Sequence, residues 1–282
     1  MCSHTDRKIE FKNSIFFNII GFMETKRFIE TKSVQNIRDL GGLKNKDGKE
    51  IRKALLLRSG SLNKINGKDM EYLKRNFNLR MIIDLRTDEE VREKPDIRID
   101  GVKYMHIPLL DSSELGMSRE EKLHLKDYVD KLPNMEKLYE NLVTNESSVS
   151  KLKEAIKTIV NNRDGAVLWH CSAGKDRCGL VAAILLELLD VDIDTIIEDY
   201  MLSNIAAEKV AKKYHFLTKL TTGDEEIAKK VYEIFVCKRS YLDVALRKME
   251  EKSGSVKDYV INELGISNAE IRNFNEYVYD IL

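Results

Sequence analysis

Short apolar runs and longer amphipathic segments alternate along the 282 residues of the chain, a pattern typical of a sheet covered by helices. Four apolar runs have the length of buried strands, and they are residues 54–58, 79–85, 102–107 and 166–169. Apolar residues at helical spacing lie between them, as in the segment from Asn66, a good helix cap, to Phe77, and in residues 149–160. The pattern predicts an α/β fold with a central, mainly parallel sheet flanked by helices.

Residues 180–189 are apolar on nearly every side, which predicts a helix buried in the core. This helix follows the loop 170–179, with the sequence His-Cys-Ser-Ala-Gly-Lys-Asp-Arg-Cys-Gly, and the loop follows the strand 166–169. A strand that leads through a tight loop into a helix directs several backbone N–H groups and the positive end of the helix dipole at one point. The order of elements therefore predicts a site for an oxyanion such as phosphate.

Two side chains of the loop suggest what happens to the bound phosphate. Cys171 lies where the N–H groups converge and is five residues before Arg177, so we expect its thiol to ionise well below the free value of about 8.5. A thiolate at neutral pH is a nucleophile. Arg177 carries a planar fork that can hold two phosphate oxygens, while Gly174 and Gly179 allow a close approach of the backbone.

The loop resembles the signature of the cysteine-dependent protein tyrosine phosphatases, with its histidine, cysteine, five intervening residues, arginine and following glycine. The Lys175-Asp176 pair before Arg177 resembles a bacterial branch of that family, and the Gly-Lys-x-Arg ending is similar to phosphoinositide phosphatases. The resemblance implies a tyrosine-phosphatase-like fold and hydrolysis through a phosphocysteine at Cys171, with Arg177 on the phosphate. It also implies a substrate cradle formed by Ser172, Ala173, Gly174, Lys175, Cys178 and Gly179.

Two aspartates are candidates for the general acid. Asp111 follows the strand 102–107 and Pro108, and this arrangement resembles the general-acid loop of tyrosine and dual-specificity phosphatases. Asp176 lies inside the loop itself and is the alternative. Asp84, at the end of the strand 79–85, is expected at the same edge of the sheet and is a candidate partner for Arg177 or a turn-capping residue.

Further stretches resemble the same bacterial branch. The turn-rich element 36–42 reads Asn-Ile-Arg-Asp-Leu-Gly-Gly, and residues 198–204 read Glu-Asp-Tyr-Met-Leu-Ser-Asn. Arg38, Asp39 and Arg58 can act on the substrate or form a structural ion-pair set beneath the loop; the sequence leaves both interpretations open.

The chain lacks a Pro/Gly/Ser-rich linker and an internal repeat, so residues 1–282 are expected to form one domain with an N-terminal extension over 1–30. The stretches 113–145 and 200–238 are longer than simple connections require and carry apolar residues at helical intervals. We expect them to be helical lid elements beside the site, or helices that only add stability.

Composition excludes some classes of function. The chain has 47 basic and 47 acidic residues, whereas proteins that bind nucleic acid usually carry a basic excess. Four scattered cysteines indicate a reducing compartment. The apolar run 15–22 is interrupted by Asn18, so neither a signal peptide nor stable membrane insertion is expected, and a cytoplasmic location follows.

These observations predict hydrolysis of phosphate monoesters, with phosphorylated protein or phosphoinositide as substrate and no cofactor or metal ion, since no cluster of His, Cys and Asp has ligand spacing. Cys178 stands where the family usually has Thr or Ser, whose hydroxyl helps the thiolate to leave, and a thiol is the weaker donor. A phosphate-binding module with little turnover is therefore one alternative. Sulfur transfer by a rhodanese-like Cys171 is the other.

Overall fold

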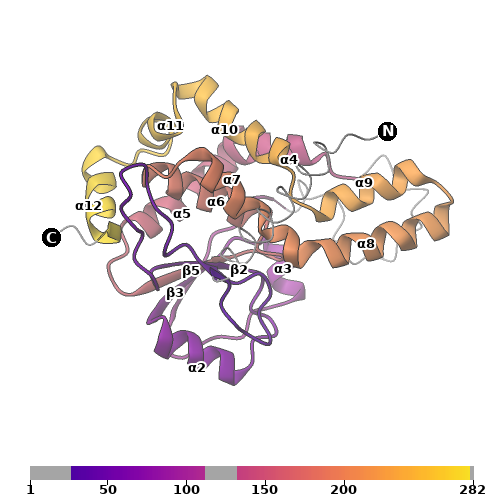
Figure 1. Cartoon of the computed structure of the whole chain (residues 1–282), viewed down its shortest axis with the longest axis horizontal. Coiled ribbons are helices and arrows are strands. Elements are labelled where there is room, and N and C mark those ends of the chain that lie inside the picture. Colours follow the sequence, from indigo (N-terminus) through magenta and orange to yellow (C-terminus); the bar gives the residue numbers. More distant parts are fainter. Residues whose placement is uncertain (1–26, 112–131, 280–282) are drawn as a thin grey trace, which may run out of the picture.

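The computed structural model describes residues 27–111 and 132–279, which form a five-stranded sheet flanked by helices (Figure 1). In chain order the strands are β1 (Arg38–Asp39), β2 (Leu56–Ser59), β3 (Leu79–Asp84), β4 (Lys103–His106) and β5 (Ala166–His170). Their order across the sheet is β1-β2-β5-β3-β4, with β1 antiparallel to β2 and all other pairs parallel. The prediction of a mainly parallel sheet is confirmed.

Strand β5 occupies the centre of the sheet and is buried along its whole length. It pairs with β2 through Ser59 opposite His170 and with β3 through Asp84 opposite His170. The carboxyl ends of three parallel strands therefore meet beside the loop that follows His170. In open α/β sheets this edge is the usual place for a ligand.

Eleven helices are described around the sheet. They are α2 (Gly67–Asn76), α3 (Asp88–Glu93), α4 (Met135–Thr144), α5 (Glu146–Val160), α6 (Asp176–Leu188), α7 (Ile193–Met201), α8 (Ser203–Thr222), α9 (Glu225–Phe235), α10 (Arg239–Ser253), α11 (Val256–Asn262) and α12 (Asn268–Tyr279).

The sheet separates two apolar layers. On one side, alternate strand residues such as Leu57, Ile82 and Leu168 pack with Leu73 of α2. On the other side, Val167 and Trp169 pack in a larger core that includes α4, α5, α6 and the C-terminal helices. Figure 1 shows α2 below the sheet, α3 beside it, and α5, α6, α7 and α10 above it. All but one of the thirteen residues of α6 are buried, as expected for a helix that is apolar on all sides.

The helix cap predicted at Asn66 is also confirmed. The side chain of Asn66 accepts a hydrogen bond from the backbone N–H of Asp69 and so caps α2. Asp192 caps α7 in the same way, through the backbone N–H of Thr195.

Helices α8 and α9 form a hairpin that extends away from the sheet at one side of the molecule (Figure 1). Tyr214 stacks on Phe235 across the pair, with ring centroids 4.7 Å apart, and Gly223 forms the turn with φ of 70°. The hairpin coincides with the expected lid element 200–238. Of the expected element 113–145, α4 is described and residues 113–131 lie outside the described part, so the lid role stays a prediction. None of the described helices has the length and apolar character needed to cross a membrane.

Candidate active site

The loop from Cys171 to Lys175 connects β5 to α6 in the order that the sequence predicts. Helix α6 begins at Asp176, and no side chain caps its N-terminus. The indole Nε1 of Trp169 donates to the carbonyl of Cys178 over 3.2 Å, which fixes the first turn of the helix to the strand. The helix end is thus held in place while its N–H groups remain open to an anion.

Three carbonyl groups of the loop are bound by side-chain donors outside it. The Asn36 amide donates to the carbonyls of Ala173 (3.1 Å) and Gly174 (3.0 Å), and Arg58 Nη2 donates to those of Gly174 (3.0 Å) and Lys175 (3.1 Å). Gly174 has φ of 68°, and a Cβ there would lie 2.4 Å from the backbone of Ser59, so only glycine fits. With its carbonyls turned outward, the loop leaves its N–H groups on the side of Cys171.

Cys171 is buried, with 3% of its surface exposed, and its thiol has an unusually low pKa. The neighbouring Cys178 thiol lowers that pKa most, and the charge of Arg177 adds to the effect against the opposing influence of burial. Cys178 is itself fully buried, and its Sγ lies 3.7 Å from the carbonyl oxygen of Ser59. Burial and the neighbouring Cys171 raise the pKa of Cys178, so this thiol stays protonated as a donor.

Arg177 has a charged partner, but it is Glu90 and not Asp84. Its Nη1 and Nη2 donate to the two carboxylate oxygens of Glu90 over 2.6 and 2.9 Å, and Ser172 donates its hydroxyl to the same carboxylate. Although burial opposes the effect, Arg177 lowers the pKa of Glu90 to about 2. Glu90 also accepts from the backbone N–H of Thr87, the residue that caps α3. A Thr-x-x-Glu capping box directly after β3 was the signal in the sequence for this residue.

Asp84 instead belongs to a buried network beneath the loop. Arg86 donates to Asp84 through Nε (2.9 Å) and Nη2 (2.6 Å), and Nη2 lies 2.8 Å from Asp96. His170 Nε2 lies 2.9 Å from Asp96, and this contact raises the pKa of His170 despite the opposing effect of burial. Tyr104 donates its hydroxyl to Asp84. The proposed pairing of Asp84 with Arg177 is therefore wrong.

The same network contains a group of three potential metal ligands, Asp84, Asp96 and His170, whose ligand atoms lie within 4.8 Å of one another. The Arg86 guanidinium already lies against both carboxylates. A divalent cation would have to displace this buried positive charge, so the arrangement fits an ion-pair network better than a metal site.

Arg38 and Arg58 form the structural ion-pair set that was one of the two interpretations of the sequence. Both are fully buried, and Asp199 of α7 binds them, with Arg38 Nε at 3.1 Å and Arg58 Nη1 at 2.8 Å. Arg27 reaches the same carboxylate at 2.7 Å, and Arg38 also donates to the hydroxyl of Ser203. These arginines lower the pKa of Asp199 in spite of its burial. Asp39 has a separate role, accepting from the N–H groups of Gly41 and Ala54 in a turn.

Lys175 is buried, with 1% of its surface exposed. Its Nζ donates to Asp176 (2.8 Å) and to the carbonyls of Ile234 (3.1 Å) and Val236 (3.3 Å) at the end of α9. An ammonium has three donor protons, so these three acceptors match its capacity. Asp176 also accepts from the Tyr139 hydroxyl at 3.1 Å. The predicted cradle residue Lys175 thus connects the loop to the α8–α9 hairpin.

Asp111, the other candidate acid, is exposed and follows the buried pair Leu109 and Leu110. These residues come after β4, whose last residue is paired with Asp84 of β3. Asp111 is thus attached to the sheet edge that carries the loop, as the sequence predicts, and its role as an acid stays a prediction.

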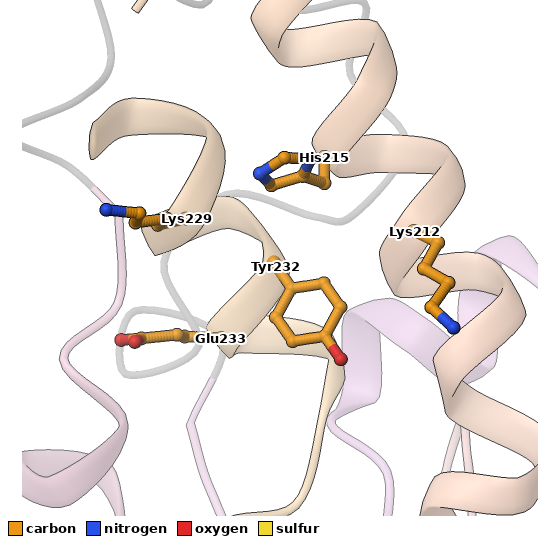
Figure 2. A pocket seen from close by; sticks show the side chains of 5 residues that line it. All are labelled: Lys212, His215, Lys229, Tyr232 and Glu233. Atoms are coloured by element: carbon orange, nitrogen blue, oxygen red, sulfur yellow. The ribbon is translucent and has the colours of Figure 1, made fainter. Parts of the chain in front are cut away.

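A separate cavity of about 480 Å³ lies between α8 and α9. Figure 2 shows Lys212 and His215 on one helix and Lys229, Tyr232 and Glu233 on the other. None of these lining residues belongs to the loop that carries Cys171. The cavity is therefore a feature of the hairpin and not of the loop.

Comparison with known proteins identifies the family of the chain. The sequence profile of a tyrosine phosphatase family matches residues 29–279. The chain belongs to this tyrosine phosphatase family. The phosphatase is 27% identical over 244 residues to a Cupriavidus necator protein named as a tyrosine-protein phosphatase, with 85% of each chain covered. It is 26% identical to the triple specificity protein phosphatase PtpB of Mycobacterium tuberculosis over 261 residues, which cover 78% of this chain and 89% of PtpB.

Family membership makes this protein an enzyme, a phosphatase of the tyrosine or dual-specificity type, as the loop sequence predicts. The matched region contains the loop and, apart from Arg27, all residues of the ion-pair networks described above. A tyrosine phosphatase from Nostoc commune is 31% identical over 150 residues, which cover 52% of this chain and 47% of that protein. Sulfur transfer, one of the alternatives from the sequence, is not the activity for which these relatives are named.

Proposed function

We propose that this phosphatase hydrolyses phosphate monoesters through a phosphocysteine on Cys171, with phosphotyrosine in proteins as its main substrate. The observation that carries the proposal is the buried Cys171, whose pKa is lowered, beside Arg177 at the uncapped N-terminus of α6. A thiolate that is stable at neutral pH, next to a cation and open N–H groups, is the combination that attack on a phosphate dianion requires.

In the first step Cys171 Sγ donates an electron pair to phosphorus, and the bond from phosphorus to the leaving oxygen breaks. The Nη1–Nη2 edge of Arg177 is bound to Glu90, so the edge that contains Nε is the one proposed to hold two phosphate oxygens. The N–H groups of the loop bind the equatorial oxygens as negative charge redistributes. Glu90 holds the guanidinium in position and does not touch the substrate.

The leaving oxygen takes a proton from an aspartic acid. Asp111 is the proposed donor, because its segment after β4 reaches the site from outside the loop. Asp176 is the second candidate; its carboxylate already accepts hydrogen bonds from Lys175 and Tyr139. These bonds favour a role for Asp176 in holding the loop.

In the second step water attacks phosphorus and the bond to Cys171 breaks, returning the electron pair to sulfur. Cys178 occupies the position at which the family usually has a hydroxyl, and the proton of its thiol stabilises the departing Cys171 thiolate. Turnover is therefore proposed, in preference to a phosphate-binding module that stops at the intermediate.

Phosphoserine, phosphothreonine and phosphoinositides are further substrate classes to test, since a relative is named for triple specificity. The contacts of Lys175 argue against one route to lipid specificity. Its three donor protons are matched by Asp176 and two carbonyls of the α9 end, so a second phosphate on an inositol ring would have to break these bonds.

The mechanism is tested by Cys171→Ser with an aryl phosphate as substrate and vanadate as competitor. Serine is not ionised at neutral pH, so activity should fall by at least about a thousandfold while the variant remains folded. Trapping the parent with acid during turnover should give a phosphorylated peptide that contains Cys171. Activity of the serine variant within tenfold of the parent would show that Cys171 is not the nucleophile.

A further inference from the structure

The outward side of α8 is the most apolar exposed surface in the described part of the chain. Eight large apolar side chains are exposed among the described residues, and five of these eight lie on α8. The three most exposed are Ile205 (59%), Phe216 (62%) and Leu220 (71%). Side chains of this size on one helix, open to solvent, indicate a surface that binds something.

These three residues share one side of the helix with lysines. Lys209, Lys212, Lys213, Phe216 and Leu220 follow Ile205 by 4, 7, 8, 11 and 15 residues. With about 3.6 residues per turn, all six residues fall within roughly one third of the circumference of the helix. We call this surface the α8 face, formed by Ile205, Lys209, Lys212, Lys213, Phe216 and Leu220; Lys212 lies at its border and also lines the cavity between α8 and α9. All six side chains are exposed.

The charge of α8 is strongly biased although that of the whole chain is balanced. The helix carries four lysines and a single glutamate, Glu208, which is paired with Lys212 at 2.8 Å. The side chains of Lys212 and Glu208 are 69% and 50% exposed, so this ion pair is weak and Lys212 can readily bind another anion instead. Lys209 and Lys213 have no acidic partner within ion-pair distance among the described residues. The α8 face therefore combines three exposed apolar side chains with three lysines.

We propose that the α8 face docks this phosphatase onto an anionic lipid bilayer. Helices that lie in a membrane interface combine exposed Phe, Leu and Ile with flanking lysines, whose charges bind anionic headgroups while the apolar side chains enter the acyl boundary. The lysine stems can extend along the apolar surface and keep their ammonium groups at headgroup level. Helix α8 is not apolar enough to span the bilayer, so it lies on the surface.

The charges of the face argue against a second copy of the chain as the occupant. A symmetric dimer through this face would bring Lys209, Lys212 and Lys213 against the same residues of the partner, and like charges in a desolvated interface are costly. An anionic bilayer carries the charge opposite to that of the lysines. It also has no fixed shape that the α8 face would have to match, so a straight row of side chains on one helix can bind it.

The hairpin that carries the face is joined firmly to the catalytic loop. Asn204, near the start of α8, exchanges two hydrogen bonds with the backbone of Cys237, of 2.9 and 2.7 Å. Lys175 binds the carbonyl ends of α9 at Ile234 and Val236. Docking through α8 would therefore hold the active site at a set distance from the bilayer. The docking does not depend on the phosphocysteine mechanism, and the two can fail separately.

The test is sedimentation of the full chain with vesicles of phosphatidylcholine alone or mixed with phosphatidylserine. The parent should bind the mixed vesicles and not the neutral ones, and added salt should release it. Two double variants test the face, one apolar and one basic: Phe216→Asp with Leu220→Asp, and Lys209→Glu with Lys213→Glu. Each double variant should bind the mixed vesicles at least about tenfold more weakly than the parent. Matched controls are Ile97→Asp and Lys64→Glu/Lys68→Glu, which alter exposed residues elsewhere and should bind as the parent does.

Hydrolysis of a soluble aryl phosphate serves as the folding control, and all these variants should retain the parent rate. Absence of parent binding to the mixed vesicles overturns the proposal, as does equal binding by the Phe216/Leu220 variant. A parent that does not bind vesicles but elutes as a dimer, with the variants as monomers, would instead assign the face to contact between copies.

Discussion

Glu90 holds the guanidinium of Arg177 in position, because the two carboxylate oxygens of Glu90 accept hydrogen bonds from Nη1 and Nη2 of Arg177. Glu90→Gln removes the charge and places an NH₂ donor against a guanidinium that can only donate. We expect kcat/KM for an aryl phosphate to fall by about ten- to a hundredfold, since a misplaced phosphate-binding fork weakens both binding and attack. Steady-state kinetics at neutral pH measures the effect.

The neighbouring variant Glu89→Gln is the control for this change. Glu89 is exposed on the same helix, so its loss should leave kcat/KM unchanged. Equal kinetics for Glu90→Gln and the parent would mean that Arg177 keeps its position without the carboxylate.

We expect Cys178 to influence the pH range in which the proposed nucleophile, Cys171, is ionised. Its hydrogen bond is the largest influence that lowers the pKa of Cys171, so thiolate should persist to more acidic pH in the parent than in Cys178→Ala. Iodoacetamide alkylates the thiolate, so its rate reports the ionised fraction of Cys171. As pH is lowered, the alkylation rate of the alanine variant should therefore drop at a higher pH than that of the parent. Cys178→Ser keeps a donor and should follow the parent. Identical pH profiles of alkylation for Cys178→Ala and the parent would show that Cys178 does not lower the pKa of Cys171.

The two candidate acids are separated by leaving groups of different quality. If Asp111 protonates the leaving oxygen, Asp111→Asn should lower turnover by about a hundredfold or more with a poor leaving group and by much less with a good one. Asp176→Asn should then reduce both to a similar extent, because the Lys175 and Tyr139 contacts hold the loop in either case. The reverse pattern would transfer the acid role to Asp176.

At the scale of single residues, the sequence led to candidates for the chemistry, whose roles stay predictions, but it did not show which side chains contact each other. Cys171 and Arg177 could be recognised because their offset lies within one loop. Asp84 ends β3 and Glu90 lies six residues further on, and the sequence does not say which of them faces Arg177. The register of β3 against β5 decides it, placing Asp84 beside His170 and Arg86 and leaving Arg177 to Glu90.

At the scale of elements, buried strands and capped helices were predictable because their patterns are local. The run 166–169 became β5, Ala166–His170, and the run 79–85 became β3, Leu79–Asp84. Strand β1 has two residues, Arg38–Asp39, too few to show an alternating pattern. The connection of Lys175 to the end of α9 was not predictable, because it joins residues about sixty positions apart through backbone carbonyls that any sequence would offer.

At the scale of the whole molecule, Asp199 joins α7 to three arginines from the N-terminal part of the chain. Asp199→Asn would leave Arg38 and Arg58 buried with little compensation, so we expect the free energy of unfolding in urea to drop by about 3–5 kcal/mol at neutral pH. Asp194→Asn on the same helix is the control, because that side chain is 80% exposed and should cost little.

The same variant gives a pH dependence with a defined sign. The folded state lowers the pKa of Asp199 below its value of about 3.9 in an unfolded chain, so its stabilisation is complete above that value and is lost as pH falls toward the folded pKa. The stability gap between parent and Asp199→Asn should therefore be widest near neutral pH and narrow as pH falls below about 4. A gap that stayed constant down to acid unfolding would contradict the ion-pair assignment.

The order β1-β2-β5-β3-β4 also has a consequence for how the chain is made. A ribosome releases β1 to β4 first, and at that stage β2 and β3 each present an unpaired edge where their common neighbour is still missing. Only when residues 166–170 emerge can β5 enter between them and complete the parallel pairs. Open edges attract other strands, and parallel pairing between distant segments is slow. Because the strand that completes the sheet also carries Cys171 at its end, a nascent chain can complete its sheet only once the proposed nucleophile is about to emerge, while much of its apolar core is still to be made.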